Sequence, residues 1–141
     1  MTLGGSFRVG SLFMEGSGQY SKVTNQAADL RLIPKWSGNV GIYFWDKLFT
    51  DHLDLKTGLR IKGFSSSQAM NYNARYQIYV TSNDPDTPGA GVLDFLLIAH
   101  IGNAYIHFIM ENLLDKQYVT TSFYPMNERN LRFWISWDFL D

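Results

Sequence analysis

The strongest constraint on the fold is a two-residue alternation near the C-terminal end of the chain. From residue 131 to residue 139 every odd position is a large apolar residue, whereas the even positions are mostly polar. Successive side chains of a β-strand point to opposite faces, so this period predicts a strand with one apolar face. A helix would distribute the same residues around its circumference. The predicted apolar face consists of Leu131, Phe133, Ile135, Trp137 and Phe139.

The same period recurs along most of the chain, with a clear pattern in the second half and a less regular one in the first third. Gly102-Asn103 separates two alternating segments and is typical of a tight hairpin turn. We therefore predict an all-β fold, an antiparallel meander of about eight strands in one unit over residues 1–141. The predicted strands are residues 6–14, 20–33, 39–46, 53–63, 74–82, 91–101, 104–112 and 129–139.

Composition excludes several classes of protein. Only 18% of the residues are charged and the net charge is −1, so no polybasic surface indicates a nucleic-acid partner. The chain has no cysteine, which excludes a disulfide scaffold, a thiol nucleophile and cysteine-ligated metal centres. Its longest apolar run, residues 95–99, is far shorter than the roughly 18 residues of a membrane-spanning helix.

The lengths of the predicted strands match those of transmembrane β-strands, which need about 9–11 residues when tilted. In a membrane barrel the apolar face contacts lipid and the polar face lines a wet lumen, whereas a water-soluble barrel has the reverse arrangement. Aromatic residues near strand ends and links of alternating length favour the membrane arrangement. The predicted lumen-facing polar ladder is Lys56, Arg60, Lys62, Arg75, Asp94, His100, His107, Glu111, Arg132 and Asp138.

A family resemblance begins at residue 34 and is strongest at the C-terminal end. Residues 111–115 read Glu-Asn-Leu-Leu-Asp, residues 123–126 read Phe-Tyr-Pro-Met, and residues 136–139 read Ser-Trp-Asp-Phe. In this order and spacing they resemble the last hairpin of TonB-dependent outer-membrane receptors. Two departures from that family are Asn127-Glu128 in place of Pro-Gly, and Leu140-Asp141 after the terminal aromatic residue.

The resemblance implies a large barrel with an internal plug domain, of which this chain would be the C-terminal segment without the plug. It implies outer-membrane lipid and the barrel assembly machinery as partners. In the intact parent it implies a TonB-type energy transducer and a bulky, scarce solute such as a metal chelate, cobalamin or a glycan. Two alternatives stay open on the sequence: a self-contained eight-strand outer-membrane barrel, and a soluble lipocalin-like barrel that binds an apolar ligand.

No catalytic, cofactor or metal site is predicted. His100 and His107 fall on one face of the predicted hairpin, where two polar residues facing a wet lumen are favoured over a metal pair. Asp94 and Glu111 are expected to join a cross-strand charge ladder with Arg132 rather than to act as a catalytic carboxylate pair. The longest predicted loop, residues 114–128, carries the candidate outer-loop residues Tyr118, Phe123, Tyr124 and Pro125.

Overall fold

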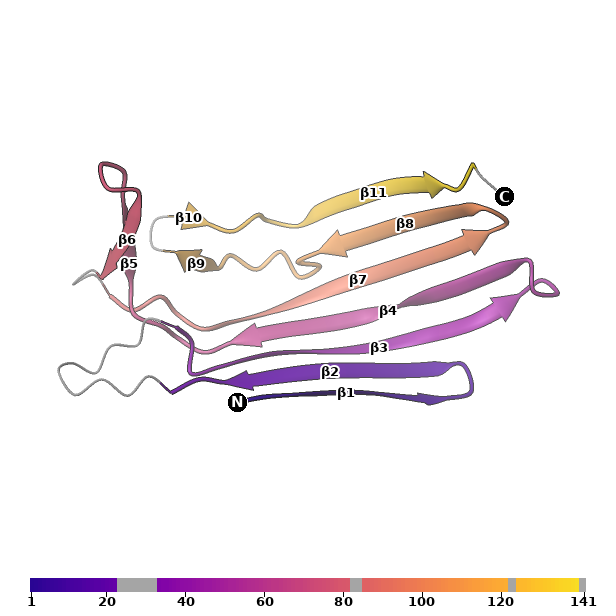
Figure 1. Ribbon diagram of the computed structural model, residues 1–141, viewed down its shortest axis with the longest axis horizontal. Helices are drawn as coiled ribbons and strands as arrows, with labels where there is room; N and C mark the ends of the chain where they lie inside the picture. Colours follow the sequence, from indigo (N-terminus) through magenta and orange to yellow (C-terminus); the bar gives the residue numbers. More distant parts are fainter. Residues whose placement is uncertain (23–32, 82–84, 122–123, 140–141) are drawn as a thin grey trace.

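The computed structural model describes residues 1–22, 33–81, 85–121 and 124–139, and within them all regular structure is β. Seven strands form one antiparallel meander in the order β1-β2-β3-β4-β7-β8-β11, and the described residues of its connections contain two small hairpins (Figure 1). The sheet is not closed, since β1 and β11 lie at its two edges. Its strands are β1 (Thr2–Val9), β2 (Leu12–Tyr20), β3 (Trp36–Leu48), β4 (Leu53–Phe64), β7 (Ala90–Ile101), β8 (Ala104–Glu111) and β11 (Asn130–Trp137).

The two small hairpins lie in the connections between strands of the main sheet. The connection from β4 to β7 contains β5 (Met70–Asn73) and β6 (Ile78–Thr81). The connection from β8 to β11 contains β9 (Val119–Thr121) and β10 (Tyr124–Pro125). Three of these four strands were predicted as loop or turn segments, because strands of two to four residues are too short to show a period.

The all-β antiparallel fold is confirmed, and five of the predicted strands coincide closely with β3, β4, β7, β8 and β11. The prediction of a single strand over residues 6–14 is wrong, because the chain turns at Gly10 and Ser11, with Gly10 at a φ of 56°. The predicted strand over residues 74–82 is also wrong in its first half, where residues 74–77 form a turn before β6. Most of the predicted strand over residues 20–33 lies outside the described residues.

The pairing register assigns every strand residue to one of two faces, since directly opposed residues point to the same side of a sheet. One row runs through Arg8, Phe13, Tyr43, Gly58, Leu96, Ile109 and Arg132. This side, which also carries Arg60 and Asp94, is called here the polar face. The opposite side, the apolar face, includes Phe7, Leu12, Val40, Ile42, Phe44, Leu59, Ile61, Phe95, Phe108, Leu131, Phe133, Ile135 and Trp137.

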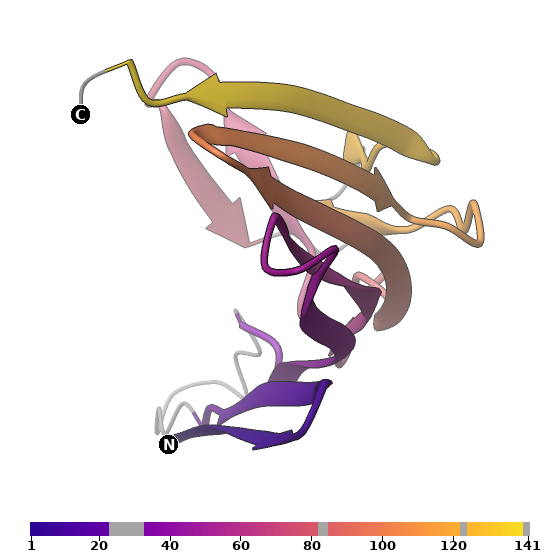
Figure 2. The same cartoon turned by 90° about the vertical axis from the view of Figure 1, so that its right-hand side faces the viewer.

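Burial is inverted relative to a water-soluble protein. On the polar face Tyr43 is 1% exposed and Asp94 is fully buried, whereas Phe133 on the apolar face is 59% exposed. The same contrast alternates along β3, where Val40, Ile42 and Phe44 are exposed on either side of buried positions. The sheet is bent (Figure 2), and side chains on the inner side of a bend shield one another. Burial therefore places the polar face on the inner side.

The connections differ in length at the two ends of the sheet (Figure 1). Residues 10–11, 49–52 and 102–103 make the three short turns, all at the end where the C-terminus lies. Residues 21–35, 65–89 and 112–129 make the three long connections at the opposite end. The strict alternation of short and long connections confirms the tendency expected from the sequence and gives the sheet two distinct ends.

Two glycines on adjacent strands leave room for aromatic rings. The Tyr43 ring lies over Gly41 of the same strand on the polar face, and a Cβ atom at Gly41 would overlap it. The Trp36 ring lies over Gly63 on the apolar face, with a ring carbon 3.5 Å from where a Cβ would be. Aromatic rings that cover strand glycines compensate for the missing side chain, and the contact of Trp36 with Gly63, which crosses from β3 to β4, also helps to fix the register.

We predict that Gly41→Ala lowers the free energy of unfolding by about 1–3 kcal/mol, because the added methyl group forces the buried Tyr43 ring out of its place. The midpoint of urea unfolding in detergent measures this loss. Gly18→Ala is the matched control, since no atom lies within 4 Å of its added Cβ. Equal losses for both substitutions would show that the Tyr43 packing contributes nothing.

Candidate functional site

The centre of the polar face is Asp94, a buried carboxylate on β7 directly opposite Arg60 of β4. Its Oδ2 lies 2.6 Å from the Lys62 Nζ and 3.4 Å from the Arg60 Nη2. Its Oδ1 accepts a hydrogen bond of 3.1 Å from the backbone N–H of Asn112. A buried carboxylate is tolerated only when opposite charges and donors surround it. Two cations and one amide meet that requirement here.

A second ion pair lies on the neighbouring strands. The Arg132 Nη2 of β11 is 2.9 Å from the Glu111 Oε2 of β8, which also accepts a 3.1 Å hydrogen bond from the Asn130 side-chain amide. The sequence predicted that Asp94 and Glu111 share a ladder with Arg132. In the structure Arg132 forms an ion pair with Glu111, whereas Asp94 pairs with the two cations of β4.

Lys56 forms a different kind of contact on the same face. Its Nζ lies 4.6 Å from the Phe13 ring, 4.3 Å from the Tyr43 ring and 5.5 Å from the Trp45 ring, with Glu15 at 4.0 Å. Cation–π attraction toward several rings holds an ammonium group close to the wall. Lys56 therefore lies against β2 and β3 and extends less freely than the cations of the Asp94 cluster.

Four rings form two stacks near the end with the short turns. His100 and Tyr105 are paired in register, with ring centroids 4.0 Å apart and ring planes 5° apart. His107 stacks in the same way on Trp134 of β11, at 4.5 Å and 5°. Stacked neighbours occupy the ring faces, so the ring edges remain for other contacts. Among the described residues, no three histidine, aspartate or glutamate side chains gather closely enough to hold a metal ion.

Two predicted members of the polar ladder lie elsewhere. Arg75 is in the turn between β5 and β6, off the main sheet, with its guanidinium 5.8 Å from the Tyr76 ring. The prediction failed because alternation over residues 74–82 spans a turn, which periodicity alone does not detect. Asp138 follows the end of β11, where its backbone N–H bonds to the Asn103 carbonyl oxygen.

The other predicted ladder residues all lie on the polar face: Lys56, Arg60, Lys62, Asp94, His100, His107, Glu111 and Arg132. Four of the five residues predicted for the apolar face of the closing strand lie on the apolar face of β11: Leu131, Phe133, Ile135 and Trp137. Phe139 lies beyond the strand, its ring 6.4 Å from that of Trp137. The structure thus brings most of the predicted residues together on the two faces.

The predicted outer loop contains the small hairpin of β9 and β10. Tyr118 precedes β9, and its ring lies 6.3 Å from that of Phe64 at the end of β4. Burial is the main factor that raises the pKa of Tyr118, and the negative charges of Asp94 and Glu111 raise it further. Pro125 belongs to β10, the Tyr124 backbone pairs with Thr121, and Phe123 lies outside the described residues.

Asn112 is a key residue that sequence reasoning did not identify. It is 2% exposed, has a φ of 52°, and bonds through its side chain to the backbone of Lys116 and Asn127. It thereby ties the connection from β8 to β11 to the Asp94 carboxylate. The available signal was an Asn directly after a strand, a residue that tolerates positive φ and bonds to nearby backbone.

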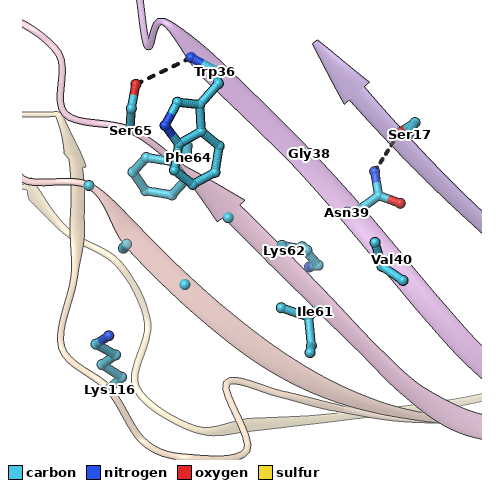
Figure 3. Close-up of a pocket in the computed structure, with 14 residues that line it drawn as sticks. Ser17, Trp36, Gly38, Asn39, Val40, Ile61, Lys62, Phe64, Ser65 and Lys116 are labelled. Carbon is cyan, nitrogen blue, oxygen red and sulfur yellow. Dashed lines mark hydrogen bonds between the residues drawn. The ribbon is translucent and has the colours of Figure 1, made fainter. Parts of the chain in front are cut away.

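A recess lies beside β3 and β4 near the long connections (Figure 3). Its volume is about 600 Å³, and its apolar walls include Trp36, Val40 and Ile61. Part of its lining is backbone, because glycines of neighbouring strands are paired in one row. The row consists of Gly18, Gly38, Gly63 and Gly91.

The fold and the two faces define a class of protein before any comparison. An antiparallel meander with a polar inner face and an exposed apolar outer face is a β-barrel-type sheet of the membrane kind. A comparison with family models matches residues 1–141 to a porin family described as "Putative porin". The chain belongs to this family.

The family match supports an outer-membrane β-barrel protein of the porin type, and it does not support the resemblance to TonB-dependent receptors. No curated protein and no solved structure matches the chain significantly. Within the described residues, no helix has the length and apolar character needed to cross a membrane.

We predict that Asp94→Asn lowers the free energy of unfolding by about 2 kcal/mol, because Lys62 and Arg60 lose their shared counter-charge. The loss is smaller than for a fully buried pair, since both cations are partly exposed. Urea unfolding in detergent measures it. Asp115→Asn is the control, because the pair of Asp115 with Arg129 is half exposed. A loss as large in the control would contradict a special role for Asp94.

Proposed function

We propose that this chain forms part of the wall of an outer-membrane channel through which small polar solutes diffuse. The observation that carries the proposal is the inverted burial of the two faces: large apolar side chains are exposed on the outside of the bend, and charges lie inside. Exposed apolar area on this scale is unstable in water and stable against lipid. The polar face then lines the wet lumen.

The lengths of the connections support an orientation in the membrane. Outer-membrane barrels have short periplasmic turns and longer outer loops. On this basis the turns at residues 10–11, 49–52 and 102–103 lie on the periplasmic side. The hairpins β5–β6 and β9–β10 lie on the outer side.

The two open edges of the sheet support the proposal that it is an arc of a larger barrel. Lipid offers no hydrogen-bond partners, so the backbone groups along the edge strands β1 and β11 must pair with further strands. First and last strands of a seven-stranded meander run in the same direction. An antiparallel barrel therefore needs additional strands between β11 and β1. Outer-membrane lipid and the barrel assembly machinery are the partners that this function requires.

The remaining alternatives are less well supported. A soluble barrel with an apolar interior disagrees with the burial of Tyr43 and Asp94 on the polar face. Energy-coupled uptake of a metal chelate, cobalamin or glycan by a TonB-dependent parent rests on the sequence resemblance alone and stays a prediction. Uptake that continues after the proton-motive force is removed would support a diffusion channel, whereas uptake that stops would support such a receptor.

We predict opposite labelling of two neighbouring residues of β11 that point to opposite faces. The chain has no cysteine, so an introduced cysteine is its single thiol and all labelling of the chain comes from that position. A charged, membrane-impermeant thiosulfonate should modify Ser136→Cys on the polar face and leave Ile135→Cys unmodified in intact outer membranes. The protein is then denatured and the remaining free thiols are labelled with a reagent that shifts the band on a gel. The unshifted band gives the fraction that the thiosulfonate had modified.

The control is Tyr76→Cys, in the exposed turn between β5 and β6, which should react fully from outside the cell. Complete modification of Ile135→Cys, at the same rate as Ser136→Cys, would show that the apolar face is in contact with water. The proposed lipid-facing wall would then be wrong.

A further inference from the structure

We propose that the polar face favours anionic solutes, with Arg60, Lys62 and Arg132 forming a cation group that binds carboxylate- or phosphate-bearing small molecules in transit. The inference rests on the proposed channel function and names its solute class. Three observations carry it: the unequal exposure of cations and carboxylates within this group, their unequal numbers, and the single long contact that Arg60 makes with Asp94.

The carboxylates lie beneath the cations. The side chain of Asp94 is 1% exposed, and that of Glu111 is 23% exposed. Those of Arg60, Lys62 and Arg132 are 30%, 41% and 58% exposed. A solute that approaches this group therefore meets its positive charges first, and its two carboxylates act from farther away.

The numbers of charges do not balance within the group. Arg60 and Lys62 share the single carboxylate of Asp94, which leaves one excess positive charge in that cluster. Glu111 balances Arg132. The lumen surface between β4 and β11 thus has a net positive charge in its middle, where a narrow wet passage with low-dielectric walls concentrates the field.

Arg60 retains hydrogen-bonding capacity. It reaches Asp94 through one long contact of 3.4 Å, whereas Lys62 takes the short one of 2.6 Å. The Arg60 Nε is buried and has no hydrogen-bond partner within the described part of the chain, so a solute would use the terminal nitrogens of this partly exposed guanidinium group. A guanidinium group carries five N–H donors in a planar arrangement that suits carboxylate and phosphate oxygens.

The three cations also follow the direction of the strands. Arg132 lies in the row of Tyr43, Arg60 in the next row toward the long connections, and Lys62 in the row after that. Successive rows are about 7 Å apart, twice the rise per residue of a strand. Arg132 is also three strands away from Arg60 and Lys62 across the sheet, so an anion that moves along the wall meets Arg132 and the β4 cations in turn.

The test is ion selectivity in planar bilayers, with the full protein extracted from its outer membrane and a KCl gradient across the bilayer. We expect channels with a Cl⁻ permeability above that of K⁺, and a current that inorganic pyrophosphate reduces. In R60Q/R132Q each removed charge should lower the Cl⁻ permeability and raise that of K⁺ by about threefold, the Boltzmann factor of a unit charge acting across about 6 Å of water, so their ratio should fall by about tenfold for each charge. In this variant Asp94 retains its ion pair with Lys62, and Glu111 retains the hydrogen bond from the Asn130 side chain.

Two variants control for the position and the sign of the charge. R60K/R132K preserves the charges and should preserve the selectivity. R75Q removes a cation from the β5–β6 turn, off the sheet, and should leave the selectivity unchanged.

The outcomes separate the two proposals. Conducting wild-type channels that prefer K⁺, or that pyrophosphate does not affect, overturn the anion preference and leave the channel function in place. Conducting R60Q/R132Q channels with unchanged selectivity overturn the anion preference in the same way. An absence of channels in wild-type protein overturns the proposed function and the anion preference together.

Discussion

The register between neighbouring strands is the constraint on which the rest of the structure depends. A slip of one residue in any strand would move its charged residues to the apolar face, because the side-chain period is two. Asp94 opposes that slip, since only the observed pairing places it against Arg60 and within reach of Lys62. The Trp36 ring of β3 opposes it as well, because it packs over Gly63 of the neighbouring β4. Electrostatic and steric contacts thus hold the same alignment.

Polar contacts on the inner face link the sheet to its outer connections. Asn112 joins the Asp94 carboxylate to the backbone of Lys116 and Asn127, so the connection from β8 to β11 is fixed to the centre of the polar face. Tyr118 packs against Phe64 at the end of β4 from the same connection. The charged centre of the polar face therefore also positions part of the connection from β8 to β11, and residues of the polar face and of this connection form one continuous structure.

Sequence reasoning was accurate where alternation is long and uninterrupted. The faces of β4, β7, β8 and β11 follow directly from their periods, and the short Gly102-Asn103 turn follows from its residue types. It failed where a turn falls inside an alternating segment, as at Gly10-Ser11 and at Arg75. A tight turn changes which parity faces inward, and the residue pattern does not mark that change when polar and apolar residues continue to alternate.

The sequence by itself determined that the chain is β-stranded and which residues of an uninterrupted strand share a face, because these properties depend on local periodicity, and its short hairpin turns indicated antiparallel pairing. It did not determine which face is inside. That required the bend of the sheet and the burial of Tyr43 and Asp94, which arise from contacts between strands far apart in the chain. The partners of each charge were likewise decided by the tertiary structure. Asp94 pairs with Lys62 and Arg60 because β4, rather than β11, lies beside β7.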